Sequence, residues 1–166
     1  MPVGEIILDV LPMETVNGAK SHHFAITTNT YSFMDIFYKI QEKANGYTDA
    51  NMTRSILYKK ESKGKHPRNV VVNFNWEKHE ATYSNFGEKM KPIAILPGSF
   101  DPLSIFFVIR LYDLKESLEI KLPVTDGKKS ISVKATVLKR ENIKLANKTY
   151  DTYLVEPDIE SISDIF

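Results

Sequence analysis

Histidines are the side chains best suited to metal binding or general-base catalysis, and the chain has four of them. His22 and His23 are adjacent, so on a strand they point to opposite faces of the sheet and cannot grip one metal ion together. Neither His66 nor His79 lies in a metal-ligand spacing such as HExxH. We therefore expect structural histidines and no metal site.

A catalytic nucleophile is not indicated either. Residues 97–101 read PGSFD, which lacks the second glycine of a G-x-S-x-G elbow. The absence of cysteine excludes thiol catalysis, Cys-ligated zinc, iron–sulfur clusters and disulfides. No Walker loop and no G-x-G-x-x-G motif is present, so we expect no cofactor and no enzymatic activity. A hydrolase would require a serine, a histidine and a carboxylate to converge in space.

One group of polar residues surrounds a helix predicted within residues 99–113. Asp101 is placed to cap its N-terminus, with a proline directly after it. Arg110 lies among apolar neighbours, and a buried arginine needs an anionic partner, for which Glu141 and Glu5 are the candidates. We expect this group either to latch the helix to the sheet or to recognise a ligand headgroup. It comprises Asp101, Ser104, Arg110, Glu141 and Glu5.

The basic run at residues 59–68 (KKESKGKHPR) has Tyr58 before it and Phe74 and Trp76 after it. Basic residues interleaved with aromatic ones can bind single-stranded nucleic acid, or anionic lipid headgroups at a membrane surface. However, 22 basic and 21 acidic side chains leave a net charge of only +1, which argues against a nucleic-acid partner. We interpret the run as a polar hairpin tip that keeps an exposed turn soluble.

The composition indicates a single globular domain over residues 1–166. Hydrophobic residues make up 42% of the chain, enough to bury a core, and 8 Tyr and 9 Phe argue against disorder. The apolar runs are too short for a membrane-spanning helix. The predicted core consists of Ile7, Phe24, Ile26, Val70, Val72, Phe74, Trp76, Phe106, Ile109, Ile131, Val133, Val137 and Leu154.

Alternating apolar and polar residues predict most of the chain as strands. The clearest alternation lies within residues 129–140, where Val133 and Val137 share one face. Weaker alternations lie at residues 5–11, which Pro12 should end, and at 21–29, 70–76 and 150–154. Turn signals stand at 17–18 and 126–127, each predicting a two-residue hairpin turn at positive φ, and also at 45–46 and 63–67. Residues 32–45 fit both a helix face and a strand.

Several motifs together resemble the exported bacterial family catalogued as domain of unknown function 3108. They are Gly4-Glu5, Asp101-Pro102-Leu103-Ser104 followed by Arg110, Asp126-Gly127-Lys128, Lys139-Arg140-Glu141 and Val155-Glu156-Pro157. The Asp-Pro-Leu-Ser segment with an arginine six residues after the serine is the most specific of them. The likeness spans the whole chain in the same order.

The resemblance implies an envelope or periplasmic location, no established activity and a strongly curved antiparallel sheet. It also implies an extended conformation for residues 32–45. Of the two conformations that this segment fits, helix and strand, we therefore expect strand. Family members usually begin with a signal sequence and continue past the position of Phe166 into further strands. The resemblance therefore predicts a chain shortened at its C-terminus.

Together these observations predict a mainly β fold: a strongly curved antiparallel sheet or half-barrel of about nine strands with one short helix packed against it. Such a sheet encloses an apolar concavity. We hypothesise a non-enzymatic envelope protein that binds a lipid, a lipoprotein or another apolar ligand there. The alternative is a structural or protein-interaction module with a filled core and no small-molecule ligand.

Overall fold

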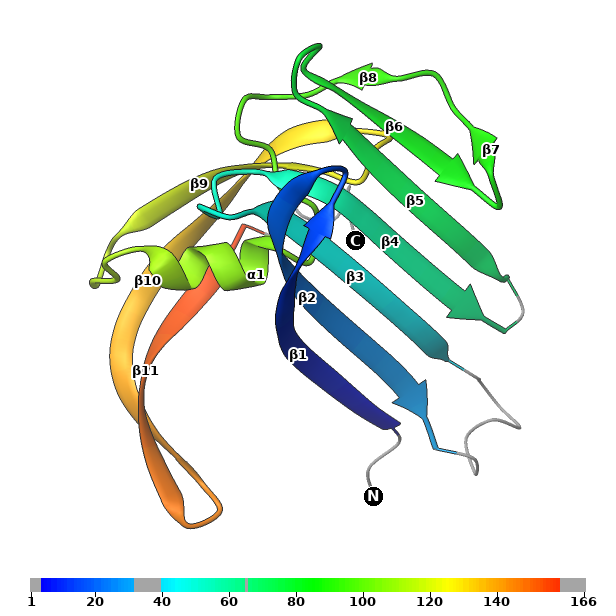
Figure 1. Cartoon of the computed structure of the whole chain (residues 1–166). Helices are drawn as coiled ribbons and strands as arrows, with labels where there is room; N and C mark the ends of the chain where they lie inside the picture. Colours follow the sequence, from blue (N-terminus) through cyan, green and yellow to red (C-terminus); the bar gives the residue numbers. More distant parts are fainter. Residues whose placement is uncertain (1–3, 32–39, 65, 159–166) are drawn as a thin grey trace.

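Consecutive hairpins build the larger of two antiparallel sheets (Figure 1). The computed structural model describes residues 4–31, 40–64 and 66–158. The strands of the larger sheet run in sequence order from β1 to β7, and β8 also pairs with β6. From β1 to β7 each strand pairs with the next one in the chain, the simplest arrangement of antiparallel strands. The strands are β1 (Gly4–Val16), β2 (Ala19–Thr30), β3 (Gln41–Asp49), β4 (Ser55–Lys63), β5 (Arg68–Asn75), β6 (Glu80–Asn85), β7 (Glu88–Lys89) and β8 (Ile93–Ala94).

The smaller sheet has the order β11-β10-β9 and lies across from the larger one. Its strands are β9 (Glu119–Thr125), β10 (Ser130–Leu145) and β11 (Lys148–Pro157). A short helical segment, α1 (Ile105–Val108) continued by the 3₁₀ turn η1 (Ile109–Leu111), lies beside the β10–β11 hairpin (Figure 1). The predicted antiparallel β architecture with one short helix is confirmed, and its strands form two sheets. Of the helices described, none has the length and apolarity to cross a membrane.

The helical segment and the residues before it have two apolar sides, one for each sheet. Phe107 stacks on Phe24 of β2, with ring centroids 4.1 Å apart, and joins the core of the larger sheet. Phe100 and Val108 instead pack against the smaller sheet, in a core that includes Val133. We call the face of the larger sheet that meets the helix its inner face. Because residues 100–108 serve both cores, the position of this segment sets how the two sheets meet.

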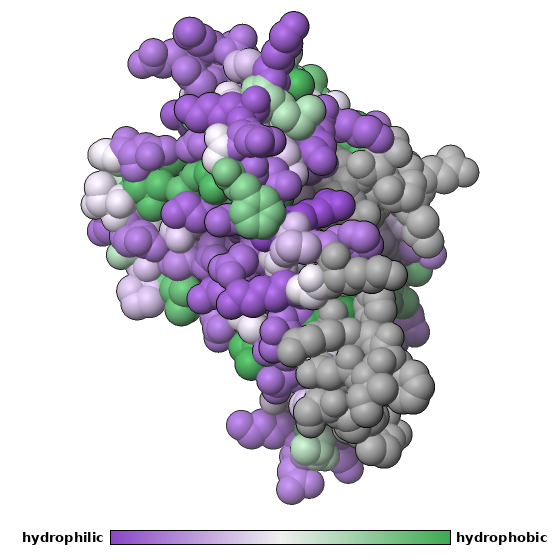
Figure 2. Space-filling view, turned by 90° about the vertical axis from the view of Figure 1, so that its right-hand side faces the viewer, coloured by the Kyte–Doolittle hydropathy of each residue, from purple (hydrophilic) through white to green (hydrophobic). Residues whose placement is uncertain are grey.

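The outer face of the larger sheet carries a small apolar cluster of its own. Val16, Tyr47, Ile56 and Leu57 are buried there. Turning the molecule by 90° brings into view a surface that is mostly hydrophilic, with hydrophobic residues in separate areas (Figure 2).

Two of the turn predictions, at 17–18 and 126–127, are confirmed in position, and a third is wrong. Asn17 and Gly18 both have positive φ (51° and 81°) and form the predicted two-residue turn between β1 and β2. The β9–β10 connection has four residues, 126–129, and at its centre Gly127 has positive φ (84°) while Asp126 does not. Its stability comes instead from the Asp126 carboxylate, whose Oδ1 accepts the amides of the two lysines that follow Gly127. The predicted turn at 45–46 is wrong, because these residues lie inside β3.

Three predicted boundaries also change. Pro12 does not end β1: the register with β2 shifts between Leu11 and Glu14, and an edge strand accommodates a proline at such an irregularity. The helix predicted within 99–113 is reduced to residues 105–111. Residues 41–45 are extended, as the resemblance implied, while residues 32–39 lie outside the part of the chain that the structure describes.

Most of the predicted core is buried or partly buried, but three of its residues are not. Ile7 is 43% exposed because β1 is the edge of the larger sheet, and Phe106 is 53% exposed on the helix. Leu154 is 40% exposed because a register shift in β10 after Val137 places Val155 opposite Val137. The prediction that residues 150, 152 and 154 form the buried stripe of this strand is therefore wrong.

Candidate functional site

A buried carboxylate holds the segment between the two sheets. Asp101 is fully buried, and its Oδ1 accepts the backbone N–H groups of Leu103 and Ser104, both at 2.9 Å. Its Oδ2 accepts the hydroxyl hydrogens of Ser55 (2.5 Å) and Ser104 (2.6 Å). The Asp101 N–H in turn donates to Ser55 Oγ at 2.8 Å. Because Ser55 is the first residue of β4, this network ties the segment to the larger sheet.

The network has the electrostatics of a structural site. Burial raises the pKa of the Asp101 carboxyl, while the hydrogen bonds from Ser104, Ser55 and the backbone oppose that shift. In the part of the chain that the structure describes, no histidine bonds to Ser55 or Ser104, so no base is placed to activate either hydroxyl. The convergence of serine, histidine and carboxylate that a hydrolase requires is not formed there.

Gly46 of β3 lets the side chains of Asp101 and Ser104 lie directly against this strand. A Cβ at this position would lie 2.6 Å from Ser104 Oγ and 2.7 Å from Asp101 Oδ1, closer than real Cβ contacts. A glycine inside a strand often marks such an approach by another segment. Gly46 is such a glycine, but together with Asn45 it forms an Asn-Gly pair, which predicts a turn instead.

The other members of the predicted polar group lie apart from the network. Arg110 is exposed on η1, and its guanidinium lies 5.5 Å from the centre of the Phe107 ring. Glu141 pairs with Lys139 at 2.7 Å, and Glu5 is exposed on the edge strand β1. Across the described ranges, Arg110 forms no ion pair with either carboxylate. The structure thus brings together Asp101 and Ser104 only.

Between α1 and the smaller sheet lies an apolar groove of about 370 Å³. Among its described lining residues only Lys134 is charged, and it pairs with Glu119 at 2.5 Å. The groove therefore offers an almost wholly hydrocarbon surface. It is lined by Ile105, Phe106, Ile109, Ile120, Leu122, Val133, Lys134, Ala135, Val155 and Pro157.

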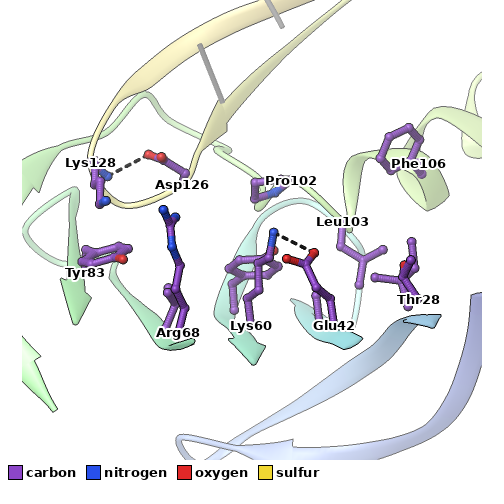
Figure 3. A pocket seen from close by; sticks show the side chains of 14 residues that line it. Thr28, Glu42, Lys60, Arg68, Tyr83, Pro102, Leu103, Phe106, Asp126 and Lys128 are labelled. Carbon is purple, nitrogen blue, oxygen red and sulfur yellow. Dashed lines mark hydrogen bonds and ion pairs between the residues drawn. The ribbon is translucent and has the colours of Figure 1, made fainter. Parts of the chain in front are cut away.

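On the other side of the helical segment, a charged cavity of about 470 Å³ lies over the inner face of the larger sheet (Figure 3). Strands β2 to β6 form its floor, and the β9–β10 turn and residues 102–106 form its roof. It is lined by Ile26, Thr28, Glu42, Ala44, Tyr58, Lys60, Arg68, Val70, Tyr83, Pro102, Leu103, Phe106, Asp126 and Lys128. Phe106 lines both the charged cavity and the apolar groove.

Two of the cationic residues of the charged cavity come from the basic run that was interpreted as a hairpin tip. Lys60 and Arg68 share the inner face with Val70, because Lys60 is paired with Val70 in the register of β4 and β5 and Arg68 lies two residues before Val70. Lys60 forms an ion pair with Glu42 at 3.1 Å. The period-two spacing of residues 58, 60, 68 and 70 is the signal that could have placed these cations beside the core.

Two of the histidines, His22 and His23, form hydrogen bonds within the protein. His23 pairs with Glu14 at 2.7 Å, and its Nε2 hydrogen-bonds to the Oδ1 acceptor of Asn45 at 2.9 Å, while His22 Nε2 hydrogen-bonds to the Ala50 carbonyl at 3.1 Å. Among the residues that the structure describes, no group of three or more His, Asp or Glu side chains is placed to hold a metal ion.

Two antiparallel sheets, a helical segment that contributes to both cores and two adjoining cavities characterise this small β protein. The family model described as a protein of unknown function, domain of unknown function 3108, matches residues 1–166. The chain therefore belongs to this family, as its motifs indicated. Comparison with curated proteins and comparison with solved structures gave no match.

The buried network predicts that two substitutions in the same segment lower the stability of the protein by very different amounts. Asp101→Ala leaves two amides and two hydroxyls without their acceptor, and we expect it to lower the free energy of unfolding by about 3–5 kcal/mol. Arg110→Ala removes only an exposed contact with an aromatic ring, so we expect a loss of about 1 kcal/mol or less. Urea denaturation followed by tryptophan fluorescence measures both, and equal losses would contradict the assignment of the latch to Asp101.

The close contact between β3 and the side chains of Asp101 and Ser104 can be tested by adding a methyl group at position 46. We expect Gly46→Ala to destabilise the protein by about 1–3 kcal/mol, because the strand or the network must shift. Lys43→Ala is the control, since Lys43 is exposed on the same strand and the change should stay within about 0.5 kcal/mol. Thermal unfolding by circular dichroism distinguishes the two, and a Gly46→Ala protein as stable as the control would refute the constraint.

Proposed function

We propose that this protein is a non-enzymatic binder of a lipid or another amphipathic ligand whose hydrocarbon chain lies in the apolar groove. The observation that carries the proposal is the groove itself: about 370 Å³ of space with an almost wholly apolar lining. This volume falls in the range of small-molecule sites in proteins. An unfilled apolar surface of this kind is costly in water, so an apolar ligand that covers it gains free energy.

Exposed apolar side chains on β1 add to this support. Ile6, Leu8 and Val10 are exposed, and their register with β2 places them on the inner face, in line with Ile26. Monomeric proteins rarely expose contiguous apolar residues without a partner or ligand. An amphipathic ligand that extends from the cavities would find further apolar surface there.

We also propose that the protein acts in the cell envelope, where lipids and lipoproteins must be handled outside the bilayer. The support for this location is the resemblance to exported proteins that the sequence motifs carry. Fractionation of cells that express the full-length gene tests it, and recovery of the protein in the cytoplasmic fraction alone would overturn it.

The groove can be closed by one substitution. Ala135 lines it and lies only partly buried on β10, so Ala135→Trp should fill the space without removing a core side chain. We expect at least a tenfold loss of affinity for a fluorescent fatty acid, because the indole occupies the site of the hydrocarbon chain. Thr136→Trp is the matched control, since the next residue on a strand faces the opposite side of the sheet.

Solvent extraction of the purified protein, followed by mass spectrometry, tests the same proposal with the ligand that the protein acquires in the cell. A stoichiometric lipid in wild type and Thr136→Trp, absent from Ala135→Trp, supports the proposal. A protein that carries no lipid and takes up no fatty acid overturns it and favours the alternative, an interaction module without a small-molecule ligand.

A further inference from the structure

We infer that the charged cavity binds the anionic headgroup, a phosphate or a carboxylate, of the amphiphile whose hydrocarbon chain lies in the apolar groove. The inference rests on the proposed function and specifies its ligand class: a single-chain amphiphile with a negatively charged end. Three features of the cavity carry it, namely its uncompensated cations, its unpartnered phenols and its contact with the groove.

The first feature is a pair of cations without anionic partners. Arg68 reaches the cavity from the start of β5, and Lys128 reaches it from the β9–β10 turn (Figure 3). Lys128 Nζ lies 4.4 Å from the centre of the Tyr83 ring. Within residues 4–31, 40–64 and 66–158, neither Arg68 nor Lys128 forms an ion pair. A guanidinium and an ammonium that converge on one space are suited to a carboxylate or a phosphate.

The carboxylates of the cavity, in contrast, are already engaged. Glu42 forms the ion pair with Lys60, at 3.1 Å. Oδ1 of Asp126 accepts the backbone amides of Lys128 and Lys129, at 2.8 and 2.9 Å. Among the lining residues that the structure describes, three cations, Lys60, Arg68 and Lys128, therefore stand against two carboxylates, and this surplus of one positive charge suits the cavity to one anion.

The second feature is a pair of buried tyrosines that line the same cavity. Tyr58 is 8% exposed and Tyr83 is 7% exposed, yet neither hydroxyl has a hydrogen-bond partner among the described residues. Every fully enclosed polar side-chain atom described does have a partner, so these two oxygens must be open to the cavity. Burial, together with the negative charges of Asp101, Glu42 and Asp126, raises the pKa of Tyr58. Its phenol therefore stays protonated at neutral pH and remains a donor for an anionic oxygen.

The third feature is the position of Phe106. Its side chain lines the charged cavity on one side and the apolar groove on the other, and it is 53% exposed. An amphiphile that crosses this residue would have its headgroup over β4 and β5 and its hydrocarbon chain between α1 and the smaller sheet. The hydrocarbon chain of one ligand would then cover the apolar surface, and its headgroup would pair with the cations.

Isothermal titration of the full chain with three matched probes tests the inference. The probes are dodecyl phosphate, dodecanoate and dodecanol, which share the chain and differ in the headgroup. We expect both anions to bind at least about tenfold more tightly than dodecanol, because charge-assisted hydrogen bonds are the stronger kind. Inorganic phosphate alone serves as the fourth titrant and shows how much of the affinity the headgroup carries without a chain.

The variant Arg68→Gln with Lys128→Gln removes the two free cations. We expect it to reduce the affinity for dodecyl phosphate to that for dodecanol, while dodecanol binding stays unchanged. The control, Lys59→Gln with Lys121→Gln, removes the same charge from two exposed lysines that do not line the cavity, and it should bind all probes like wild type. Tyr58→Phe removes one hydroxyl and should weaken dodecyl phosphate binding by about threefold to tenfold.

The outcomes separate this inference from the proposed function. Equal binding of dodecanol and dodecyl phosphate by wild type would overturn the headgroup site and leave the lipid-binding proposal standing. Binding of inorganic phosphate as tightly as dodecyl phosphate would keep the anion site, identify free phosphate as its ligand and overturn the role of the chain. Binding of none of the four probes would overturn both.

Discussion

The fully buried carboxylate of Asp101 is the constraint on which the rest of this structure depends. Burying a charge is costly unless hydrogen bonds replace water, and here two hydroxyls and two backbone amides do so. One of those hydroxyls belongs to Ser55 at the start of β4, so the segment that carries Asp101 has a single position on the larger sheet. Gly46 provides the space for that position, because any larger residue would collide with the carboxylate. A polar network at the centre of an apolar protein thus specifies where the two sheets meet.

The cavities follow from that position. Residues 100–108 act as a wedge whose two apolar sides each complete one core. A wedge this short covers only part of each sheet, so the inner face of the larger sheet and the face of the smaller sheet beside α1 remain partly open. The first opening is bordered by charged strand residues and the second by hydrocarbon side chains. Phe106 lies between them, and a ligand with a charged end and an apolar end would fit this arrangement.

Family membership and geometry contribute different things to the functional argument. The family match covers the whole chain but describes a protein of unknown function, so it supplies no reaction and no ligand. The geometry supplies an apolar groove and a cavity lined by cations and tyrosines, and the ligand that we propose is inferred from the chemistry of these groups. The proposal of a binding protein rests on these groups.

The sequence by itself determined the local features: most strands with period-two alternation, the Asn17–Gly18 turn and the family. It also singled out Asp101, although as a helix cap, whereas the helix begins only at Ile105 and Asp101 instead accepts the amides of Leu103 and Ser104. Each of the local features depends on neighbouring residues and on the conformations that they prefer. The tertiary structure alone decided which residues meet across the chain. Asp101 bonds to Ser55, 46 positions away, and Lys60 and Arg68 converge with Lys128 only because the β9–β10 turn lies over β4 and β5. Arg110 was predicted to be buried and paired, yet it is exposed on η1, where it faces away from both cores and lies over the Phe107 ring. Such outcomes depend on how two sheets pack, and no local pattern contains that information.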